Sequence, residues 1–141
     1  MHPYRYRISL RLRHPSVTSS AICAALLPLK PTYPPQDIGA PRTAPNGRLL
    51  GGLNTETFAT FFVSRGENDL AEALGEAAER MEPCRECFAL WRASGGDIEF
   101  FVGWFMEGGN VGDVFEPELL AQLGGLGIGL SLDLYESDRD E

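Results

Sequence analysis

A Cys-x-x-Cys pair is the feature of this 141-residue chain that most resembles a reactive site. Cys84 and Cys87 lie in the stretch MEPCRECFALW, and the chain has one further cysteine, Cys23. Such a pair can supply two of the four ligands of a structural zinc ion or form a redox-active dithiol. Alternatively, both thiols pack in the core as small apolar groups.

The sequence around the pair favours core packing. On a helix, two aromatic residues would share one apolar face with the cysteines, at the i, i+3, i+4 and i+7 positions Cys84, Cys87, Phe88 and Trp91. A zinc site would lack ligands, since the rest of the chain offers only Cys23 and two histidines. A helix beginning at Pro83 would stabilise a thiolate at Cys84, whereas the adjacent Glu82 and Glu86 would raise the pKa of that thiol. We therefore predict no metal or other cofactor, and the redox pair is the less favoured interpretation.

Other catalytic patterns are missing from the sequence. There is no Gly-x-Ser-x-Gly motif, and the two histidines, His2 and His14, both lie near the start of the chain. The glycine-rich stretches LGGLGIG and EGGNVGD lack the lysine and the strand–loop–helix context of a phosphate-binding loop. We therefore predict that the protein is not an enzyme.

Arginines and aromatic residues are expected to meet on one face of a sheet. Residues 4–13 alternate strictly, so three aliphatic residues point to one side and the arginines to the other. Residues at every second position of two later strands can lie on the same side of the sheet as these arginines. The candidate binding face comprises Arg7, Arg11, Arg13, Phe101, Phe105, Asp133 and Tyr135. An exposed apolar sheet face typically marks a protein interface; the alternative is a ladder of cross-strand charge pairs.

A proline-rich segment provides a second candidate site. Six of the ten prolines lie within residues 28–48, which excludes a helix or a central strand there. Loops of this length without secondary structure are commonly functional. Gly39 and Arg42 are the candidate residues of this loop site.

The remaining patterns predict one domain, residues 1–141, in which strands alternate with helices. Strands are expected at 4–13, 57–64, 97–106 and 128–137, and helices at 16–27, 69–81, 83–94 and 116–123. We expect an α+β two-layer sandwich, with a mainly antiparallel sheet of four or five strands, helices on one face and a ferredoxin-like topology. The acidic tail, residues 136–141, is expected to be frayed.

Composition narrows the class of partner. The net charge of −8 argues against nucleic acid, whose binding depends on positive charge. No apolar run approaches the roughly 20 residues that cross a bilayer, and three cysteines do not form a secreted disulfide framework. We therefore expect a cytoplasmic protein. The first 36 residues contain five basic and no acidic side chains, as a targeting segment would. The alternation of residues 4–13 instead favours a surface strand.

Two segments resemble a known family. The order of elements, the stretch LLPLKPTYPPQDIGAPR and the closing LGIGLSLDLYES are similar, over nearly the whole chain, to the bacterial family called domain of unknown function 4279. The resemblance implies a small stand-alone domain and supplies no catalytic residues. The family is not known for a Cys-x-x-Cys pair at this position.

Together these observations predict a non-enzymatic protein-interaction module of the immunity or scaffolding type. Its partner would be another protein, or a second copy bound through the open sheet face, and neither nucleic acid nor a membrane. The alternative is a small-molecule-binding or thiol-redox protein that uses the proline-rich loop or Cys84 and Cys87.

Overall fold

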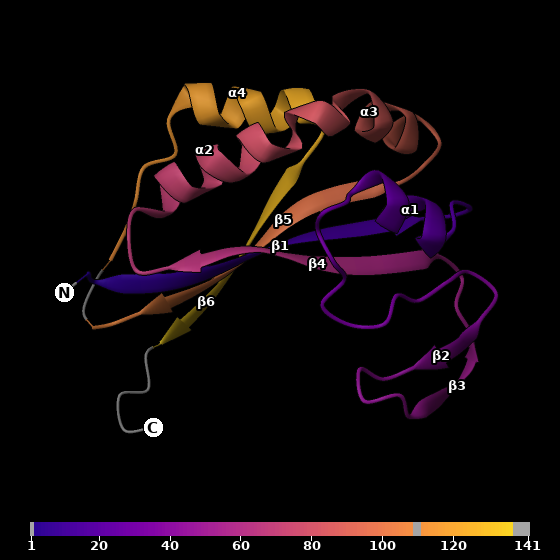
Figure 1. Cartoon of the computed structure of the whole chain (residues 1–141). Helices are drawn as coiled ribbons and strands as arrows, with labels where there is room; N and C mark the ends of the chain where they lie inside the picture. Colours follow the sequence, from indigo (N-terminus) through magenta and orange to yellow (C-terminus); the bar gives the residue numbers. More distant parts are fainter. Residues whose placement is uncertain (1, 109–110, 137–141) are drawn as a thin grey trace.

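A four-stranded sheet forms the centre of the protein, and the helices cover one of its faces (Figure 1). The computed structural model describes residues 2–108 and 111–136. Along the sheet the strands are β4 (Thr57–Gly66), β1 (Tyr4–His14), β5 (Asp97–Met106) and β6 (Gly129–Glu136). β1 is antiparallel to both neighbours, whereas β5 and β6 are parallel. The predicted α+β sandwich with a mainly antiparallel sheet is confirmed.

The connections between strands depart from the ferredoxin-like order. That order, β-α-β-β-α-β, joins two of its strands directly. Here α2 (Leu70–Met81), η1 (Glu82–Cys84) and α3 (Arg85–Ala93) join β4 to β5, and α4 (Pro117–Leu126) joins β5 to β6. Because β5 and β6 are parallel, a crossover such as α4 is required between them. The expected topology is therefore wrong in its connectivity.

The alternation of β1 decides which side of the sheet is buried. Ile8, Leu10 and Leu12 are buried, and the neighbouring Arg7, Arg11 and Arg13 lie on the opposite side. β1 is a central strand of the sheet, although its pattern had predicted a surface strand. The aliphatic and aromatic residues of alternate positions in β5 complete this side: Ile98, Phe100, Val102 and Trp104. Burying one such side chain contributes about 1.5–3 kcal/mol.

Helix ends follow the capping rules, and α1 and α4 differ from their predicted bounds. Asp69 caps α2 as predicted, since its carboxylate accepts a hydrogen bond from the Glu72 amide at 3.2 Å. α1 (Ser19–Ala25) begins after Thr18, whose hydroxyl accepts from the Ala21 amide. α4 continues to Leu126 because Gly127, with φ 76°, adopts the left-handed conformation that ends it.

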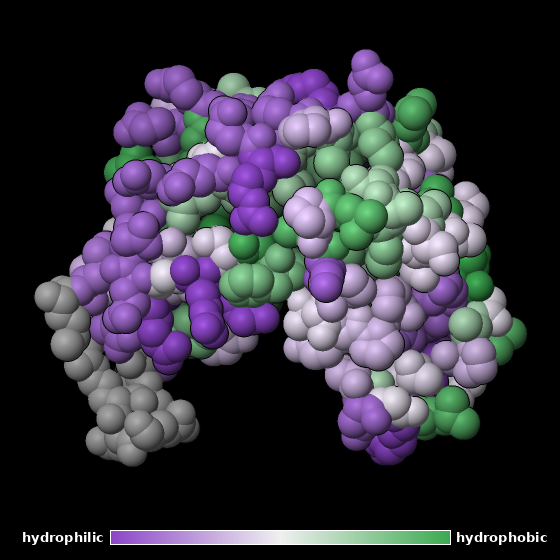
Figure 2. Space-filling model, in the orientation of Figure 1, coloured by the Kyte–Doolittle hydropathy of each residue, from purple (hydrophilic) through white to green (hydrophobic). Residues whose placement is uncertain are grey.

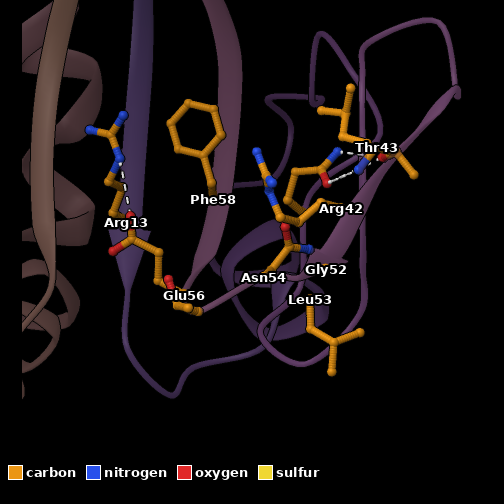
Figure 3. Close-up of a pocket in the computed structure, with 11 residues that line it drawn as sticks. Arg13, Arg42, Thr43, Gly52, Leu53, Asn54, Glu56 and Phe58 are labelled. Atoms are coloured by element: carbon orange, nitrogen blue, oxygen red, sulfur yellow. Dashed lines mark hydrogen bonds and ion pairs between the residues drawn. The ribbon is translucent and has the colours of Figure 1, made fainter.

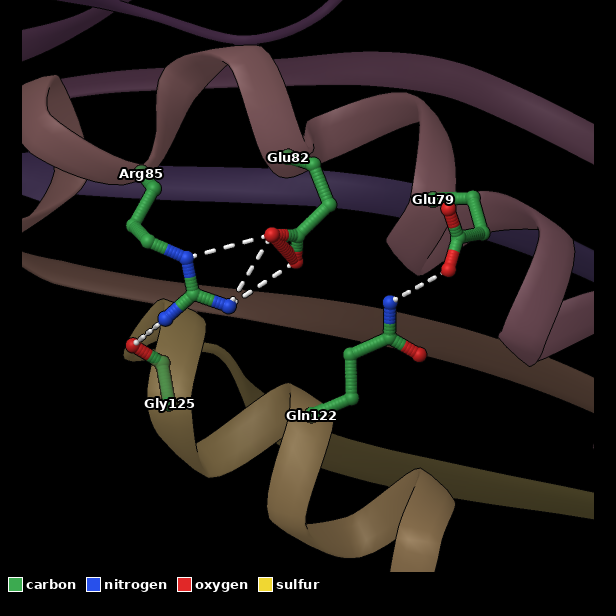
Figure 4. Close-up of polar contacts among 5 residues, drawn as sticks. All are labelled: Glu79, Glu82, Arg85, Gln122 and Gly125. Carbon is green, nitrogen blue, oxygen red and sulfur yellow. Dashed lines mark hydrogen bonds and ion pairs between the residues drawn. The ribbon is translucent and has the colours of Figure 1, made fainter.

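Polar side chains fix α4 to the helices beside it (Figure 4). Arg85 donates to the Gly125 carbonyl at 2.8 Å and to both carboxylate oxygens of Glu82. Gln122 donates to Glu79 at 3.0 Å. Lone carbonyls at a helix C-terminus need such donors, so these contacts hold the end of α4 over the sheet.

The proline-rich segment has two parts. Residues 31–36 run along the outer edge of β4, where the Thr32 and Gln36 amides donate to the Thr60 and Phe58 carbonyls, both at 2.8 Å. The second part was expected to be a loop but forms β2 (Pro41–Thr43), which pairs with β3 (Leu49–Leu53). This hairpin lies outside the main sheet. Residues 31–36 thus cover the edge of the main sheet that β4 forms.

Two sequence expectations concern chain ends and membranes. Glu136 ends β6, and the remaining residues of the predicted tail, 137–141, lie outside the described residues. Within the described part of the chain, no helix has the length and apolar character that a membrane span requires.

Candidate binding face

The side of the sheet opposite the helices is open and concave. In the view of Figure 1, β6 and the β2–β3 hairpin both extend below the centre of the sheet. The space-filling view shows a notch on the underside of the molecule beside the hairpin (Figure 2). We call this side the open face. Its outward residues come from all four strands, since residues at alternate positions of neighbouring strands share a side.

Each of the four outward arginines of β1 stacks on a phenylalanine ring. The distances from the guanidinium carbon to the ring centre are 4.5 Å for Arg5 on Phe105, 4.6 Å for Arg7 on Phe62, 3.8 Å for Arg11 on Phe101 and 4.8 Å for Arg13 on Phe58. The rings belong alternately to β5 and β4. Such stacks contribute about 0.5–1 kcal/mol each at exposed sites. They also hold the guanidinium groups against the sheet.

Three of these arginines also pair with a carboxylate. Arg5 lies 3.2 Å from Glu107, Arg11 lies 3.4 Å from Glu99, and Arg13 lies 3.4 Å from Glu56. Arg7 differs: among the described residues, no carboxylate oxygen lies within 4.0 Å of its guanidinium. The charge-ladder interpretation therefore applies to part of the open face, and Arg7 has no ion pair among the described residues.

A hollow of about 340 Å³ lies near the middle of the open face, and we call it the aromatic hollow. Ser9 and Gly103 are the small residues on its strands, and Tyr33 and Pro45 of the proline-rich segment face it. Its aromatic lining is Phe58, Phe101, Phe105 and Tyr135. The Tyr135 ring stacks on Phe105 at 4.9 Å. A volume near the lower end of the range for ligand pockets suits a side chain or a small molecule.

All seven residues of the predicted binding face lie on the open face. Asp133 accepts a hydrogen bond from the Tyr135 hydroxyl, and this bond raises the pKa of Tyr135. Arg13 lies outside the aromatic hollow, towards the hairpin. Sequence reasoning missed Phe58 and Phe62, although their alternation with buried Phe61 is visible in the sequence. Tyr33 and Pro45 carried no such signal.

A second hollow, of about 580 Å³, separates the hairpin from the end of the sheet (Figure 3). Arg42 of β2 lies on one side of it and donates to the Gly51 carbonyl at 3.3 Å, while the Arg13–Glu56 pair lies on the other. Gly39, the other predicted loop residue, is not among the residues around this hollow; its amide donates to the Asn54 carbonyl.

The cysteines pack against the core. Phe88 and Trp91 are buried, and Cys84 and Cys87 are half-buried beside them. Pro83 lies in the short helix η1, so α3 begins after Cys84, two residues later than predicted. Burial raises the pKa of both thiols, and in Cys87 the neighbouring Cys84 adds to the effect. A raised pKa makes a thiol less reactive at neutral pH.

The side chains that could bind a metal lie apart in the described structure, and one of the two histidines is buried. Within residues 2–108 and 111–136, no three His, Cys, Asp or Glu side chains are grouped so that they could hold a metal. His14 is buried at the end of β1, where its Nδ1 accepts from the amides of Ser16 and Val17 and its Nε2 lies 2.8 Å from the Ser94 hydroxyl. These bonds give His14 a structural role.

The fold and its open face define a two-layer α+β protein with an arginine- and phenylalanine-lined sheet surface. Comparison of the chain with models of protein families, with curated proteins and with solved structures found no match. The resemblance to domain of unknown function 4279 therefore stays a prediction.

Proposed function

We propose that the protein is a non-enzymatic interaction module that binds another protein on its open face. The observation that carries this proposal is the row of four arginines stacked on phenylalanines across the open face. Arginine and aromatic residues dominate the energetic centres of protein interfaces. Stacking holds these side chains in place before binding, which reduces the entropy lost on association.

The charge of the open face indicates the chemistry of the partner. Five arginines lie on it or at its rim, at positions 5, 7, 11, 13 and 65, and two of them lack a carboxylate within 4.0 Å in the described structure. The face also carries Glu56, Glu99, Glu107 and Asp133, while many of the other acidic residues lie in the helical layer. A partner that presents carboxylates between apolar side chains would complement this face.

The test is an affinity capture that compares two matched variants. Arg11→Gln removes a cation from the open face, and Arg92→Gln removes one from α3, where it donates to the Gly127 carbonyl. We expect the native protein and Arg92→Gln to retain the same partner, and Arg11→Gln to lose at least about tenfold in affinity, or 1.4 kcal/mol. Light scattering in the same buffer identifies a second copy as the partner if the mass doubles.

Two results would overturn the proposal. One is a partner that Arg11→Gln and Arg92→Gln retain equally, because the contact would then lie elsewhere. The other is the absence of any partner at low salt, where arginine contacts are strongest.

Small-molecule binding is the second candidate function, and the 580 Å³ hollow beside Arg42 favours it. A thermal shift caused by a small ligand and lost in Arg42→Ala would support this candidate. The redox alternative gains nothing from the half-buried thiols, because burial raises their pKa.

A further inference from the structure

Arg7 and Arg65 form a like-charged pair at one end of the open face. They lie directly opposite each other in the register of β1 and β4. Like charges in this position destabilise a sheet. In the described part of the chain no carboxylate oxygen lies within 4.0 Å of either guanidinium, although Arg5, Arg11 and Arg13 each have one. The fold thus keeps two cations together, and no carboxylate of the described residues forms an ion pair with either of them.

A β-bulge creates this pair. Ser9 pairs with Phe62, but Ile8 pairs with Ser64, so β4 has one extra residue, Val63, at this point. In a regular ladder the partner of Arg7 would be Ser64, and the bulge moves Arg65 into that place. Bulges are over-represented beside functional sites, where they redirect a side chain.

The two arginines line a hollow of about 420 Å³, which we call the arginine hollow. Arg5 and Phe105 also line it, and so does Glu67, which forms no ion pair with either Arg7 or Arg65. Arginine presents a planar fork of N–H donors that matches the oxygens of a carboxylate or phosphate. This hollow therefore has the donors and the charge to bind an oxyanion.

The aromatic hollow adjoins the arginine hollow, since Arg7 and Phe105 line both. Gly103 lies opposite Arg7 in β5, and a Cβ atom there would lie 3.4 Å from Cε2 of Phe105. Glycine weakens a central strand and often marks the close approach of a ligand. Because Gly103 has no side chain, the rings of Phe105 and Tyr135 lie close to the strand, and they line the aromatic hollow.

We infer that the two hollows together bind an oxyanion carried on an aromatic ring. Arg7 and Arg65 bind the oxygens, and the ring lies beside Phe105 and Tyr135 in the aromatic hollow. This inference rests on the open face being the binding surface. The ligand is either a phosphorylated or carboxylate-bearing aromatic group of the docked protein or a free aryl phosphate or carboxylate, and both sources share the same chemistry.

The test uses four probes titrated into the full-length chain and followed by amide chemical shifts. Phenyl phosphate and phenylacetate carry both features, inorganic phosphate lacks the ring, and benzyl alcohol lacks the charge. We expect millimolar or tighter binding of at least one of the two aryl anions, with shifts at Arg7, Arg65 and Gly103. Inorganic phosphate should bind more weakly, and benzyl alcohol should cause no saturable shift.

Variants locate the site. Arg7→Gln and Arg65→Gln should weaken aryl-anion binding about tenfold each, or 1.4 kcal/mol. Arg13→Gln makes the same charge change on the same face outside both hollows and should change affinity less than about twofold. Gly103→Val fills the aromatic hollow and should remove the advantage of the aryl anion over inorganic phosphate.

Three outcomes would overturn the inference: no aryl-anion binding at millimolar concentration, equal weakening by Arg13→Gln, or tight binding of benzyl alcohol. If the probes fail while Arg11→Gln still loses a captured protein, the oxyanion site is wrong and the docking face remains. If the probes bind but no protein is captured, the oxyanion site stands and the protein-docking proposal is wrong. A phosphotyrosine pentapeptide that binds tighter than phenyl phosphate identifies a protein segment as the source.

Discussion

The cysteines show how helical spacing decides between chemistry and packing. Cys84 and Cys87 form a motif in the sequence, but the structure places Cys84 at the end of η1 and Cys87 in α3, both packed against the core that contains Phe88 and Trp91. Burial raises the pKa of each thiol, and a raised pKa lowers the fraction of the reactive thiolate at neutral pH. The pair therefore behaves as part of the core.

The thiols should accordingly react slowly in the folded protein. At pH 7.5 we expect a chromogenic disulfide reagent to modify them on the order of tenfold more slowly than in the urea-unfolded chain. Because the pKa values are raised, the native rate should increase steadily as the pH rises. Cys84→Ala should remove one slowly reacting thiol. Two thiols that react rapidly at pH 7 would contradict core packing and revive the redox interpretation.

Sequence periodicity predicted which residues share the open face, but it could not predict their partners. Alternation places Arg7 and Arg11 on the same side of β1 whatever the neighbouring strands do. Which arginine meets a carboxylate depends on register, and the bulge at Val63 shifts that register by one residue. No glycine marks this bulge in the sequence, so the Arg7–Arg65 pair could not have been foreseen.

At the scale of elements, a hydrogen-bonded tyrosine joins β1 to α2 and to the segment after β5. The Tyr4 hydroxyl accepts from the Leu70 amide and donates to Asp113, both at 2.8 Å, and Asp113 also accepts from the Ala71 amide. Burial raises the pKa of Tyr4 to about 12. Burial alone would raise the pKa of Asp113, but hydrogen bonds from Tyr4 and nearby amides lower it overall.

Asp113→Asn should therefore destabilise the protein in a pH-dependent way. A carboxyl with a lowered folded-state pKa contributes stability above its unfolded pKa, about 3.9, and loses that contribution as pH falls through the folded value. We expect the variant to lose about 1 kcal/mol of unfolding free energy at pH 7 and the difference to shrink below about pH 4. Urea unfolding at both pH values measures this.

Asp133→Asn is the matched control, because Asp133 bonds the exposed Tyr135 at the edge of the sheet. Surface hydrogen bonds of this kind contribute little, so we expect a change within about 0.5 kcal/mol at either pH. A loss in Asp113→Asn that is equal at pH 7 and pH 3 would show that the carboxylate charge has no role in the connection.

Elements with strong local signals were predictable, and those formed by long-range pairing were not. The Asp69 cap and the apolar stripe of α2 specify that helix by themselves. The β2–β3 hairpin contains Pro41 and two glycines with positive φ, Gly51 and Gly52, which argue against strands. Its turn, Pro45-Asn46-Gly47, was the one local signal for it.

At the scale of the whole molecule, charge is divided between the two layers. The net charge of −8 predicts long-range repulsion of other anions. Locally, however, the open face carries five arginines beside four carboxylates, those of Glu56, Glu99, Glu107 and Asp133. The helical layer and its caps carry a larger group of acidic residues: Asp69, Glu72, Glu76, Glu79, Glu82, Glu86, Glu116 and Glu118. A net charge computed from the sequence cannot reveal this division, so an acidic protein can still offer a site for anions.

Local stability should also differ between the main sheet and the β2–β3 hairpin. The core lies between the helices and the main sheet, whereas the residues of β3 are all exposed, with Leu49 70% and Leu53 61% accessible. Regions with few buried contacts open well below the global unfolding free energy. The hairpin that borders the open face should therefore open while the sheet stays folded.

Native-state hydrogen exchange measures this difference. We expect the amides of β1 and β5, the two central strands, to exchange only by global unfolding, and those of β2 and β3 to exchange at least about 2 kcal/mol more easily. Because the segment that contains the hairpin supplies Pro45 and Tyr33 to the aromatic hollow, a ligand bound there should slow hairpin exchange specifically. If the hairpin amides are as protected as those of β1, the expected difference in local stability is wrong. The hairpin would then be as rigid as the core of the sheet.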